Sequence, residues 1–250
     1  MSDRSAAWLC RPGSHPVASL ASHRTATGKL RWLATLSPEA AGEYATAVAS
    51  VVSSAERRLG PEVMADRVRS GPSVGPPVLR LAPWQRARAR WRASAVRGLE
   101  GTTRALVVTD VRDCFASVSA DTVRRALREA GAPGPAVERV VACLHAFAEE
   151  GIVGLPVGPA ASAVLANVTL AGLDEALRRR GTRHLRWVDD VVAFAPSKAD
   201  ALLLLGELHR ASERIGLELH GEKTRLVDDP AEARSILGAS NSPGAAAGMA

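Results

Sequence analysis

Runs of apolar residues in the second half of the chain predict strands at three places. The segment TRALVVTDV at 103–111 contains a continuous apolar run and predicts a buried strand. Two further runs, at 184–188 and 191–195, predict the two strands of a hairpin, and two adjacent acids fill the turn between them. The acids at these strand ends are Asp110, Asp189 and Asp190.

Helical periodicity between the strands predicts the other elements. Serine caps, first-turn acids and closing glycines mark the helix ends. Helices are predicted at 119–130, 135–150, 160–180 and 197–216, a Gly/Pro loop at 151–159, a short hairpin or strand pair at 217–227, and one more short strand at 235–239. This order predicts an α+β fold with the helices on one face of the sheet, close to the split βαβ arrangement.

The N-terminal part of the chain has weaker patterns. Residues 1–28 show no clear periodicity, so we expect a poorly ordered arm. A serine cap followed by Pro-Glu at 37–39 predicts a helix that runs to about Leu59. The Ser/Gly/Pro segment at 70–77 is a loop by composition.

A strongly basic helix is predicted over the segment APWQRARARWRASAVRGLE, residues 82–100. Trp84 and Trp91 are seven residues apart and share one helical face, so we expect them to form a stripe in the core. The arginines around the rest of the helix fit either a phosphate-facing surface or a solvated one.

Composition narrows the class of protein. The chain has 250 residues, 46% of them hydrophobic, enough for a substantial core. Its cysteines are scattered and follow no C-x-x-C spacing, which argues against a disulfide framework or a zinc site and favours a reducing cytoplasm. No apolar run suggests a membrane span, and no signal-peptide pattern opens the chain. The cysteines are Cys10, Cys114 and Cys143.

Charge is unevenly distributed along the chain. The net charge is +6, but residues 1–105 hold 16 basic and 7 acidic residues, whereas residues 106–250 hold 16 and 19. A basic part beside an acidic part fits a grip on a polyanion next to a metal-binding carboxylate site. The alternative is that the 29 arginines, against three lysines, reflect genome composition.

The three acids at the strand ends suggest metal chemistry. Adjacent carboxylates repel each other, and a cation relieves that repulsion. If the strand ending at Asp110 neighbours the hairpin that carries Asp189, the carboxylates converge and can hold Mg²⁺, which prefers hard oxygen ligands. Two such ions about 4 Å apart stabilise both oxygens of a phosphoryl transfer. Each acid alone is more often a cap or a solvated turn residue.

Five segments, in this order, resemble the catalytic blocks of reverse transcriptases. They are DVRDCFASV at 110–118, GLPVGPAASAVLANVTLAGLD at 154–174, WVDD at 187–190, GLELHGEKTRL at 216–226 and ILG at 236–238. The PVGP sequence at 156–159 looks most like the bacterial abortive-infection and defence-associated lineages. The resemblance implies a polymerase palm, a ferredoxin-like split βαβ sheet, preceded by a mainly helical fingers-like region.

The resemblance also implies the metal ligands. Asp110 and Asp189 would hold two Mg²⁺ ions, for which Mn²⁺ could substitute, together with the backbone carbonyl of Val111. Asp190 would complete the carboxylate cluster. The implied enzyme is therefore a metal-dependent nucleotidyltransferase.

Further roles follow for residues that contact the substrate. Phe115 would lie under the nucleotide sugar and exclude a 2′-hydroxyl, which favours dNTPs. Lys223 would approach the leaving pyrophosphate as a general acid. The remaining implied contacts are a floor under the templating pair at Pro156, Val157 and Gly158, and triphosphate contacts at Lys29 and Arg31.

The predicted organisation follows from these blocks. We expect a poorly ordered arm at 1–28, a fingers-like region at 29–102, a palm at 103–238 and a disordered tail at 239–250. Reverse transcriptases normally continue into a helical thumb, and none is expected here, so a protein partner that supplies one is part of the hypothesis.

The hypothesis is a cytoplasmic, Mg²⁺-dependent RNA-directed DNA polymerase with no membrane association. It would copy an RNA template into DNA by adding dNTPs to a DNA or protein primer, or would synthesise DNA without a template, in phage defence. Two alternatives stay open. One is a polymerase-like nucleic-acid-binding scaffold without turnover, and the other is a palm-fold cyclase, which would carry Gly-Gly-Asp/Glu where this chain has Val-Asp-Asp.

Overall fold

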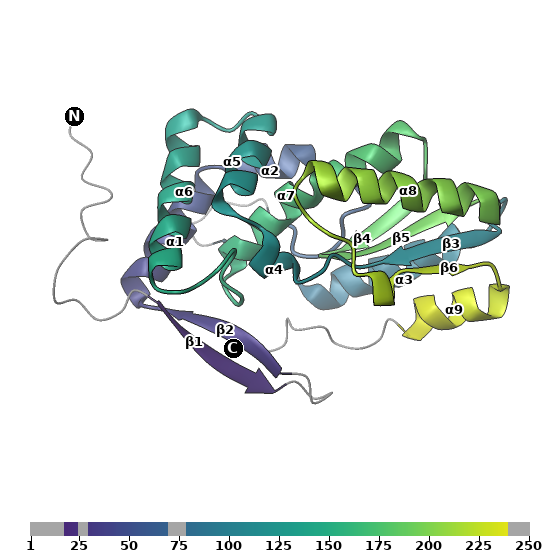
Figure 1. Ribbon diagram of the computed structural model, residues 1–250, viewed down its shortest axis with the longest axis horizontal. Helices are drawn as coiled ribbons and strands as arrows, with labels where there is room; N and C mark the ends of the chain where they lie inside the picture. The colour runs from purple at the N-terminus through teal and green to yellow at the C-terminus, as the bar shows by residue number, and fades with distance from the viewer. Residues whose placement is uncertain (1–17, 25–29, 70–78, 240–250) are drawn as a thin grey trace. The chain divides into compact units, whose positions relative to one another are not determined.

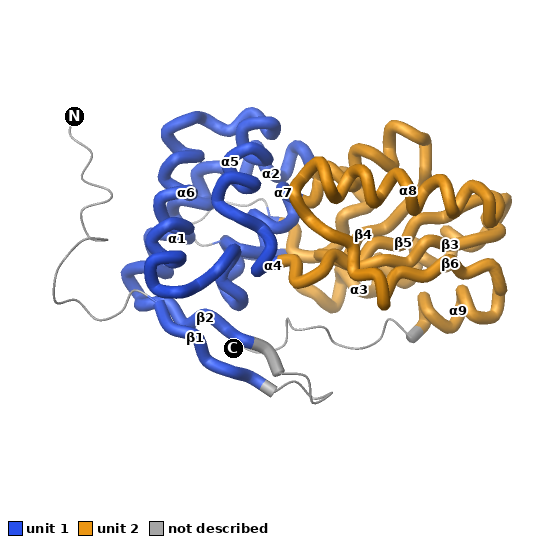
Figure 2. Tube along the Cα trace, in the orientation of Figure 1, with its two compact units in different colours: residues 1–58, 68–81, 115–169 blue, residues 59–67, 82–114, 170–250 orange. Residues whose placement is uncertain are grey.

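The computed structural model describes residues 18–24, 30–69 and 79–239 (Figure 1). The chain forms two compact units whose segments alternate along the sequence (Figure 2). The first unit consists of residues 1–58, 68–81 and 115–169, and the second of residues 59–67, 82–114 and 170–250. The division into arm, fingers-like region, palm and tail stays a prediction, and the predicted loop at 70–77 and nearly all of the predicted tail lie outside the described residues.

A β-hairpin in the first unit corrects one expectation. The strands β1 (Ala18–Arg24) and β2 (Leu30–Leu36) pair antiparallel, from Ala18 opposite Leu36 to Arg24 opposite Leu30. Part of the predicted arm is therefore a strand, and the rest of the arm lies outside the described residues. The pattern missed β1 because only Ala18 among its described side chains is buried. The backbone ladder to β2 holds the strand, and no apolar face marks it.

The helices of the first unit follow their predicted caps, with one difference. They are α1 (Pro38–Ala49), α2 (Val52–Arg58), α5 (Ala120–Glu129) and α6 (Gly134–Glu149), beside the short α4 (Cys114–Ser117). The single helix expected up to Leu59 is two helices, because the Ser50 hydroxyl donates to the carbonyl of Ala47 at 2.6 Å and competes with the backbone ladder. Tyr44 and Phe147 meet edge to face in the core, with ring centroids 5.2 Å apart.

A four-stranded antiparallel sheet forms the centre of the second unit. Its order is β4-β5-β3-β6, and its strands are β3 (Ala105–Thr109), β4 (His184–Trp187), β5 (Asp190–Ala195) and β6 (Arg225–Val227). The buried strand and the hairpin predicted from the apolar runs are both present. A mixed α and β fold with antiparallel sheets is thus confirmed, while its assignment to palm and fingers stays a prediction.

Helices cover both faces of this sheet, so the expectation of helices on one face is wrong. On one face, Leu106, Val192 and Phe194 pack against α3 (Trp84–Gly98) and α9 (Pro230–Ala239). Figure 1 shows α8 (Lys198–Arg214) on the side of the sheet opposite α9. The sheet is therefore buried on both sides, which explains why β3 and β5 are apolar at consecutive positions.

Two other expectations for the second unit were wrong. Residues 217–227 do not pair with each other: Leu219 bridges Val111, a 3-10 turn (η1, Gly221–Lys223) follows, and β6 pairs with β3. Residues 235–239 belong to helix α9 rather than to a strand. The carboxylate of Asp229 accepts the backbone N–H groups of Ala231 and Glu232 and starts this helix.

The tryptophan stripe is only half right. Trp91 is 2% exposed and Trp84 is 42% exposed. The buried face of α3 begins at Ala87, one turn after Trp84, so the stripe does not reach the start of the helix. The predicted basic helix itself is confirmed.

The long helix α7 (Ala160–Arg179) contributes its first half to one unit and its second half to the other. By length and composition it is the single helix among the described residues that could cross a membrane. Because 83% of its apolar stretch is buried inside the protein, its burial is that of a core helix.

Gly98 tests the packing of α3 on the sheet. A Cβ at this position would lie 2.2 Å from two ring atoms of Phe194, and a rigid ring gives way poorly. We expect Gly98→Ala to lower the free energy of unfolding by roughly 1–3 kcal/mol, measured by denaturant titration. Gly42 in α1 has open space around its Cβ, so the control Gly42→Ala should raise stability by about 0.5–1 kcal/mol. Equal effects of the two substitutions would contradict this packing.

Candidate active site

The candidate site lies where β3 ends and the β4–β5 turn begins. Thr109 of β3 pairs with Val191 of β5, so Asp110 follows directly opposite Asp190. Asp189 lies in the two-residue turn between the paired residues Trp187 and Asp190. The register of two strand pairs thus brings together three acids that are far apart in the sequence.

The turn that carries Asp189 has an unusual backbone. Val188, its first residue, has φ of +55°, in the left-handed region where a β-branched residue is rare. Such a conformation costs about 1–3 kcal/mol and persists only where the surroundings enforce it. Trp187 just before it meets Trp91 edge to face, with ring centroids 6.1 Å apart. The turn is therefore held under strain beside a packed aromatic pair.

Burial and neighbouring charges raise the pKa values of Asp189 and Asp190. Burial, followed by the charges of Asp190 and Asp110, raises the pKa of Asp189 to about 7. Desolvation by the surrounding protein, followed by the charge of Asp110, raises the pKa of Asp190 to about 6. Asp190 is exposed at the surface, so solvent screens its interactions more than those of Asp189. The carboxylates of Asp110, Asp189 and Asp190 lie close together, and their combined negative charge forms a site that attracts a cation.

Lys223 supplies a positive charge to the same cluster. Its ammonium donates to the carboxylate of Asp110, and this bond together with the three carboxylate charges raises the lysine pKa against the opposing effect of partial burial. The backbone N–H of His220 donates to the carbonyl of Asp110 at 2.7 Å. Thr109 and Thr224 share a hydrogen bond of 2.7 Å between their hydroxyls. The 220–224 turn is thus tied to the end of β3, and Lys223 with it.

The residues present fit a divalent metal. Carboxylate oxygens are the hard ligands that Mg²⁺ prefers, and Asp110, Asp189 and Asp190 present them together. Val111 bridges Leu219, but the hydrogen bonds of this bridge use the carbonyls of Asp110 and Glu218 and not that of Val111. The carbonyl of Val111, the expected ligand, therefore follows Asp110 in the chain and takes no part in the hydrogen bonds between Val111 and Leu219.

Arg88 is a further charged residue of the site, and the pattern of arginines does not distinguish it. Its guanidinium carbon lies 5.1 Å from the ring centroid of Trp187, and its charge acts on Asp190. Partial burial and the neighbouring Arg92 lower its pKa. Only the side-chain periodicity of α3 against the sheet could have indicated that this arginine points to the turn.

The other predicted substrate contacts lie in the first unit. The N–H of Leu155 donates to the carbonyl of Phe115 at 2.7 Å, and the N–H of Ala34 in β2 donates to the carbonyl of Val157 at 2.9 Å. Gly154 has φ of +76°, and a Cβ there would lie 2.3 Å from the carbonyl oxygen of Phe115, so only glycine fits. Backbone hydrogen bonds thus join the 154–158 loop to Phe115 and to strand β2.

The remaining loop residues differ in their exposure. Pro156 is buried, Val157 is half-buried and Gly158 is exposed. Arg31 lies in β2, and Lys29 lies outside the described residues. The roles expected of these residues stay predictions.

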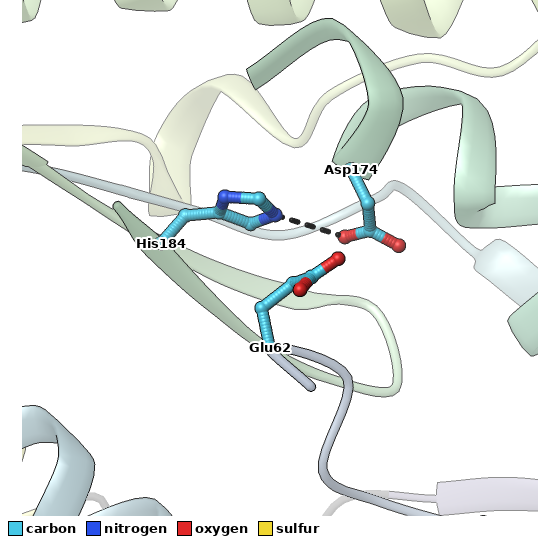
Figure 3. A group of neighbouring side chains, drawn as sticks. All are labelled: Glu62, Asp174 and His184. Atoms are coloured by element: carbon cyan, nitrogen blue, oxygen red, sulfur yellow. Dashed lines mark ion pairs between the residues drawn. The ribbon is translucent and has the colours of Figure 1, made fainter. Parts of the chain in front are cut away.

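A second acidic cluster is buried near β4 (Figure 3). Glu62, Asp174 and His184 point toward one another, with their ligand atoms within 4.8 Å. Arg186 donates to both oxygens of Asp174 at 2.8–3.0 Å, and Arg178 donates to Glu62 at 2.9 Å. Burial alone would raise the pKa of Asp174, but Arg186 and His184 lower it. Guanidinium groups already neutralise these acids, so the cluster is better suited to an ion-pair network than to a metal.

The sequence of this chain matches a protein-family model. Residues 62–239 match the family model described as reverse transcriptase (RNA-dependent DNA polymerase). No curated protein matches the chain. The matched range covers well over half of the chain and includes the three acids, Lys223 and Arg88, and it excludes Lys29 and Arg31.

Neutralising Asp189 should stabilise the metal-free protein. The folded pKa of about 7 lies above the ordinary value of 3.8, so the folded state resists ionisation and loses stability as the pH rises between these values. At about pH 8 we expect Asp189→Asn to raise the free energy of unfolding by at least about 1 kcal/mol, which corresponds to roughly 2–4 °C in Tm. Thermal melts across a pH series should show this difference disappear toward pH 4.

Without metal, Asp189→Asn should therefore melt at a higher temperature than the wild type at about pH 8. Adding Mg²⁺ should raise the Tm of the wild type and not that of Asp189→Asn, so that the wild type becomes the more stable protein. The matched control is Asp121→Asn, because Asp121 is an exposed acid in the first turn of α5. Its Tm should respond to Mg²⁺ as the wild type does. A metal-free Asp189→Asn protein that melts below the wild type at about pH 8 would contradict the electrostatic description of the site.

Proposed function

Because this chain belongs to the reverse transcriptase family, we propose that it is an RNA-dependent DNA polymerase that adds dNTPs to a primer by metal-assisted phosphoryl transfer. The observation that carries the proposal is the convergence of Asp110, Asp189 and Asp190 at the end of β3 and the β4–β5 turn. A nucleic-acid scaffold without turnover has no use for three converging acids, at two of which, Asp189 and Asp190, burial and neighbouring charges raise the pKa.

Each acid has a part in the proposed reaction. Asp110 and Asp189, with the carbonyl of Val111, would hold two Mg²⁺ ions, and Asp190 would complete the cluster. When bound, the ions supply positive charge to both the attacking and the leaving oxygen, and Mn²⁺ could replace them. Strand pairing holds Asp110 and Asp189 in place before substrate arrives, so little reorganisation is needed in the transition state.

The bond changes define what Lys223 can contribute. The 3′-hydroxyl of the primer gives its proton to water, its oxygen bonds to the α-phosphorus of the dNTP, the bond from that phosphorus to the bridging oxygen breaks, and pyrophosphate leaves. Lys223 is tied to the end of β3 and carries a proton because the acids raise its pKa. We assign it the transfer of that proton to the pyrophosphate.

Substrate selection is assigned to residues of the first unit. Phe115 would lie beneath the sugar and exclude a 2′-hydroxyl, with its backbone fixed by Leu155. Pro156, Val157 and Gly158 would support the templating base pair, and Lys29 and Arg31 would contact the triphosphate. These assignments follow from resemblance in sequence, and the anchored loop supports them.

The finer biological assignment also belongs to the proposal. The PVGP segment supports a bacterial, defence-associated lineage, in which the primer is DNA or protein. Cys114 and Cys143 are buried free thiols, which supports a reducing cytoplasm as the location.

Primer extension tests the proposed function. Purified protein with Mg²⁺, labelled dNTPs, an RNA template and a DNA primer should incorporate nucleotide, and a parallel reaction without template separates copying from untemplated synthesis. We expect Asp189→Ala to lower the rate at least about 100-fold, because one metal ligand is lost. Asp121→Ala, a control for removal of an acid elsewhere, should keep wild-type activity.

Two outcomes would count against the proposal. Unchanged activity in Asp189→Ala would overturn the assignment of the metal site. A wild-type protein that incorporates no dNTP with any template or primer, yet binds nucleic acid, would favour the scaffold.

A further inference from the structure

Arg186, a buried arginine, connects the second acidic cluster to the turn formed by Val188 and Asp189. The side chain of Arg186 is fully buried, as is that of Asp174. Its Nε and Nη2 atoms donate to the carboxylate of Asp174 at 2.8–3.0 Å, and its Nη1 atom donates to the carbonyl oxygen of Val188 at 2.8 Å. A single planar group thus binds an acid with one edge and the turn with the other.

The bond to Val188 addresses the strain in that turn. Val188 has φ of +55°, which a β-branched residue adopts only when its surroundings hold it there. A hydrogen bond to its carbonyl from a charged donor is stronger than a neutral one and fixes the orientation of the peptide that leads into Asp189. Without this bond, the left-handed conformation of Val188 would be less stable.

The guanidinium can do this because its own position is fixed on several sides. His184 Nε2 lies 3.4 Å from the carboxylate of Asp174, with Glu62 beside them (Figure 3). Arg178 forms an ion pair of 2.9 Å with Glu62. The backbone of Arg186 is bonded on its outer side, where its N–H donates to the carbonyl of Glu62 and its carbonyl accepts from Met64. Arg186 therefore has a rigid base from which its Nη1 reaches the turn.

A buried ion pair of this kind is a poor device for stability alone. Replacing such a pair with apolar residues of similar size is often neutral or stabilising, because desolvation offsets the attraction. The pair is therefore better explained by what its third donor does than by the energy of the pair itself.

We propose that Arg186, oriented by Asp174, is a positioning residue that holds Val188 in its left-handed conformation and so directs the carboxylate of Asp189 toward Asp110. The inference rests on the proposed function, because it assigns a role in aiming a metal ligand. Asp174 and Arg186 would then determine the geometry of the site, although neither is one of the three acids that would bind the metal.

Variants can separate positioning from folding. Arg186→Lys keeps the buried charge, but a single ammonium cannot bind Asp174 and reach Val188 as a forked guanidinium does. The double variant Asp174→Leu/Arg186→Met removes the ion pair without leaving a buried charge. Arg178→Met is the control, since Arg178 belongs to the same cluster and donates to Glu62.

The readouts are Tm, Mn²⁺ binding followed by electron paramagnetic resonance, and steady-state primer extension. We expect both Arg186 variants to fold, to bind Mn²⁺ more weakly, and to lose at least about 10-fold in kcat while the KM for dNTP changes less than about 3-fold. Arg178→Met should keep wild-type kcat. Adding Val188→Gly to the double variant should restore part of the kcat, because glycine adopts the left-handed conformation without strain.

The outcomes distinguish failure of this inference from failure of the proposed function. If the wild type is active and the folded double variant keeps its kcat, or if Arg178→Met loses as much, Arg186 does not position the turn. If the wild type shows no incorporation, the proposed function fails, and unweakened Mn²⁺ binding in the double variant would then overturn the positioning role as well.

Discussion

The antiparallel pairing of β3 with β5 is the constraint on which the candidate site depends. This register sets Asp110 opposite Asp190, and the tight turn before β5 adds Asp189. A slip of one residue would send Asp110 and Asp190 to opposite faces of the sheet. Because α3 and α9 cover one face and α8 packs on the strands as well, such a slip would also move the side chains of the slipped strand away from the helices against which they pack. Burial also reaches the site itself: Asp110 is largely buried and bonds to Lys223, and burial raises the pKa of Asp189.

Much of the second unit could be predicted from the sequence, because its signals are local and strong. The apolar run before Asp110 and the two runs around the Val-Asp-Asp turn predicted β3, β4 and β5, and the capping serines Ser119 and Ser197 predicted where α5 and α8 begin. The approach of Asp110 to Asp189 followed from pairing the strands that carry them. Lys223 was singled out by resemblance, and its bond to Asp110 is a structural finding that its position in the chain did not require.

The features that escaped prediction depend on contacts between distant residues. The hairpin strand β1 has few buried side chains, so no periodicity marks it. The segment around Ile236 is short and apolar, and such a segment fits a strand or a buried helix equally until Asp229 is recognised as its cap. Arg88 and Arg186 are two arginines among 29, and only the fold shows that one faces the turn and the other lies beneath it. The expectation of one covered sheet face failed because α3 precedes the sheet in the sequence and returns to pack on it.

The raised pKa of Asp189 has a consequence for how this protein would change in laboratory evolution. A folded chain that resists ionising one of its own residues gains stability from almost any substitution that removes the charge, without repacking its core. A screen for heat resistance alone would therefore enrich changes at the turn and would return well-folded proteins that have lost the carboxylate cluster. Heat resistance and retention of the turn would have to be selected together, and sites away from both the turn and the proposed substrate contacts offer the safer targets.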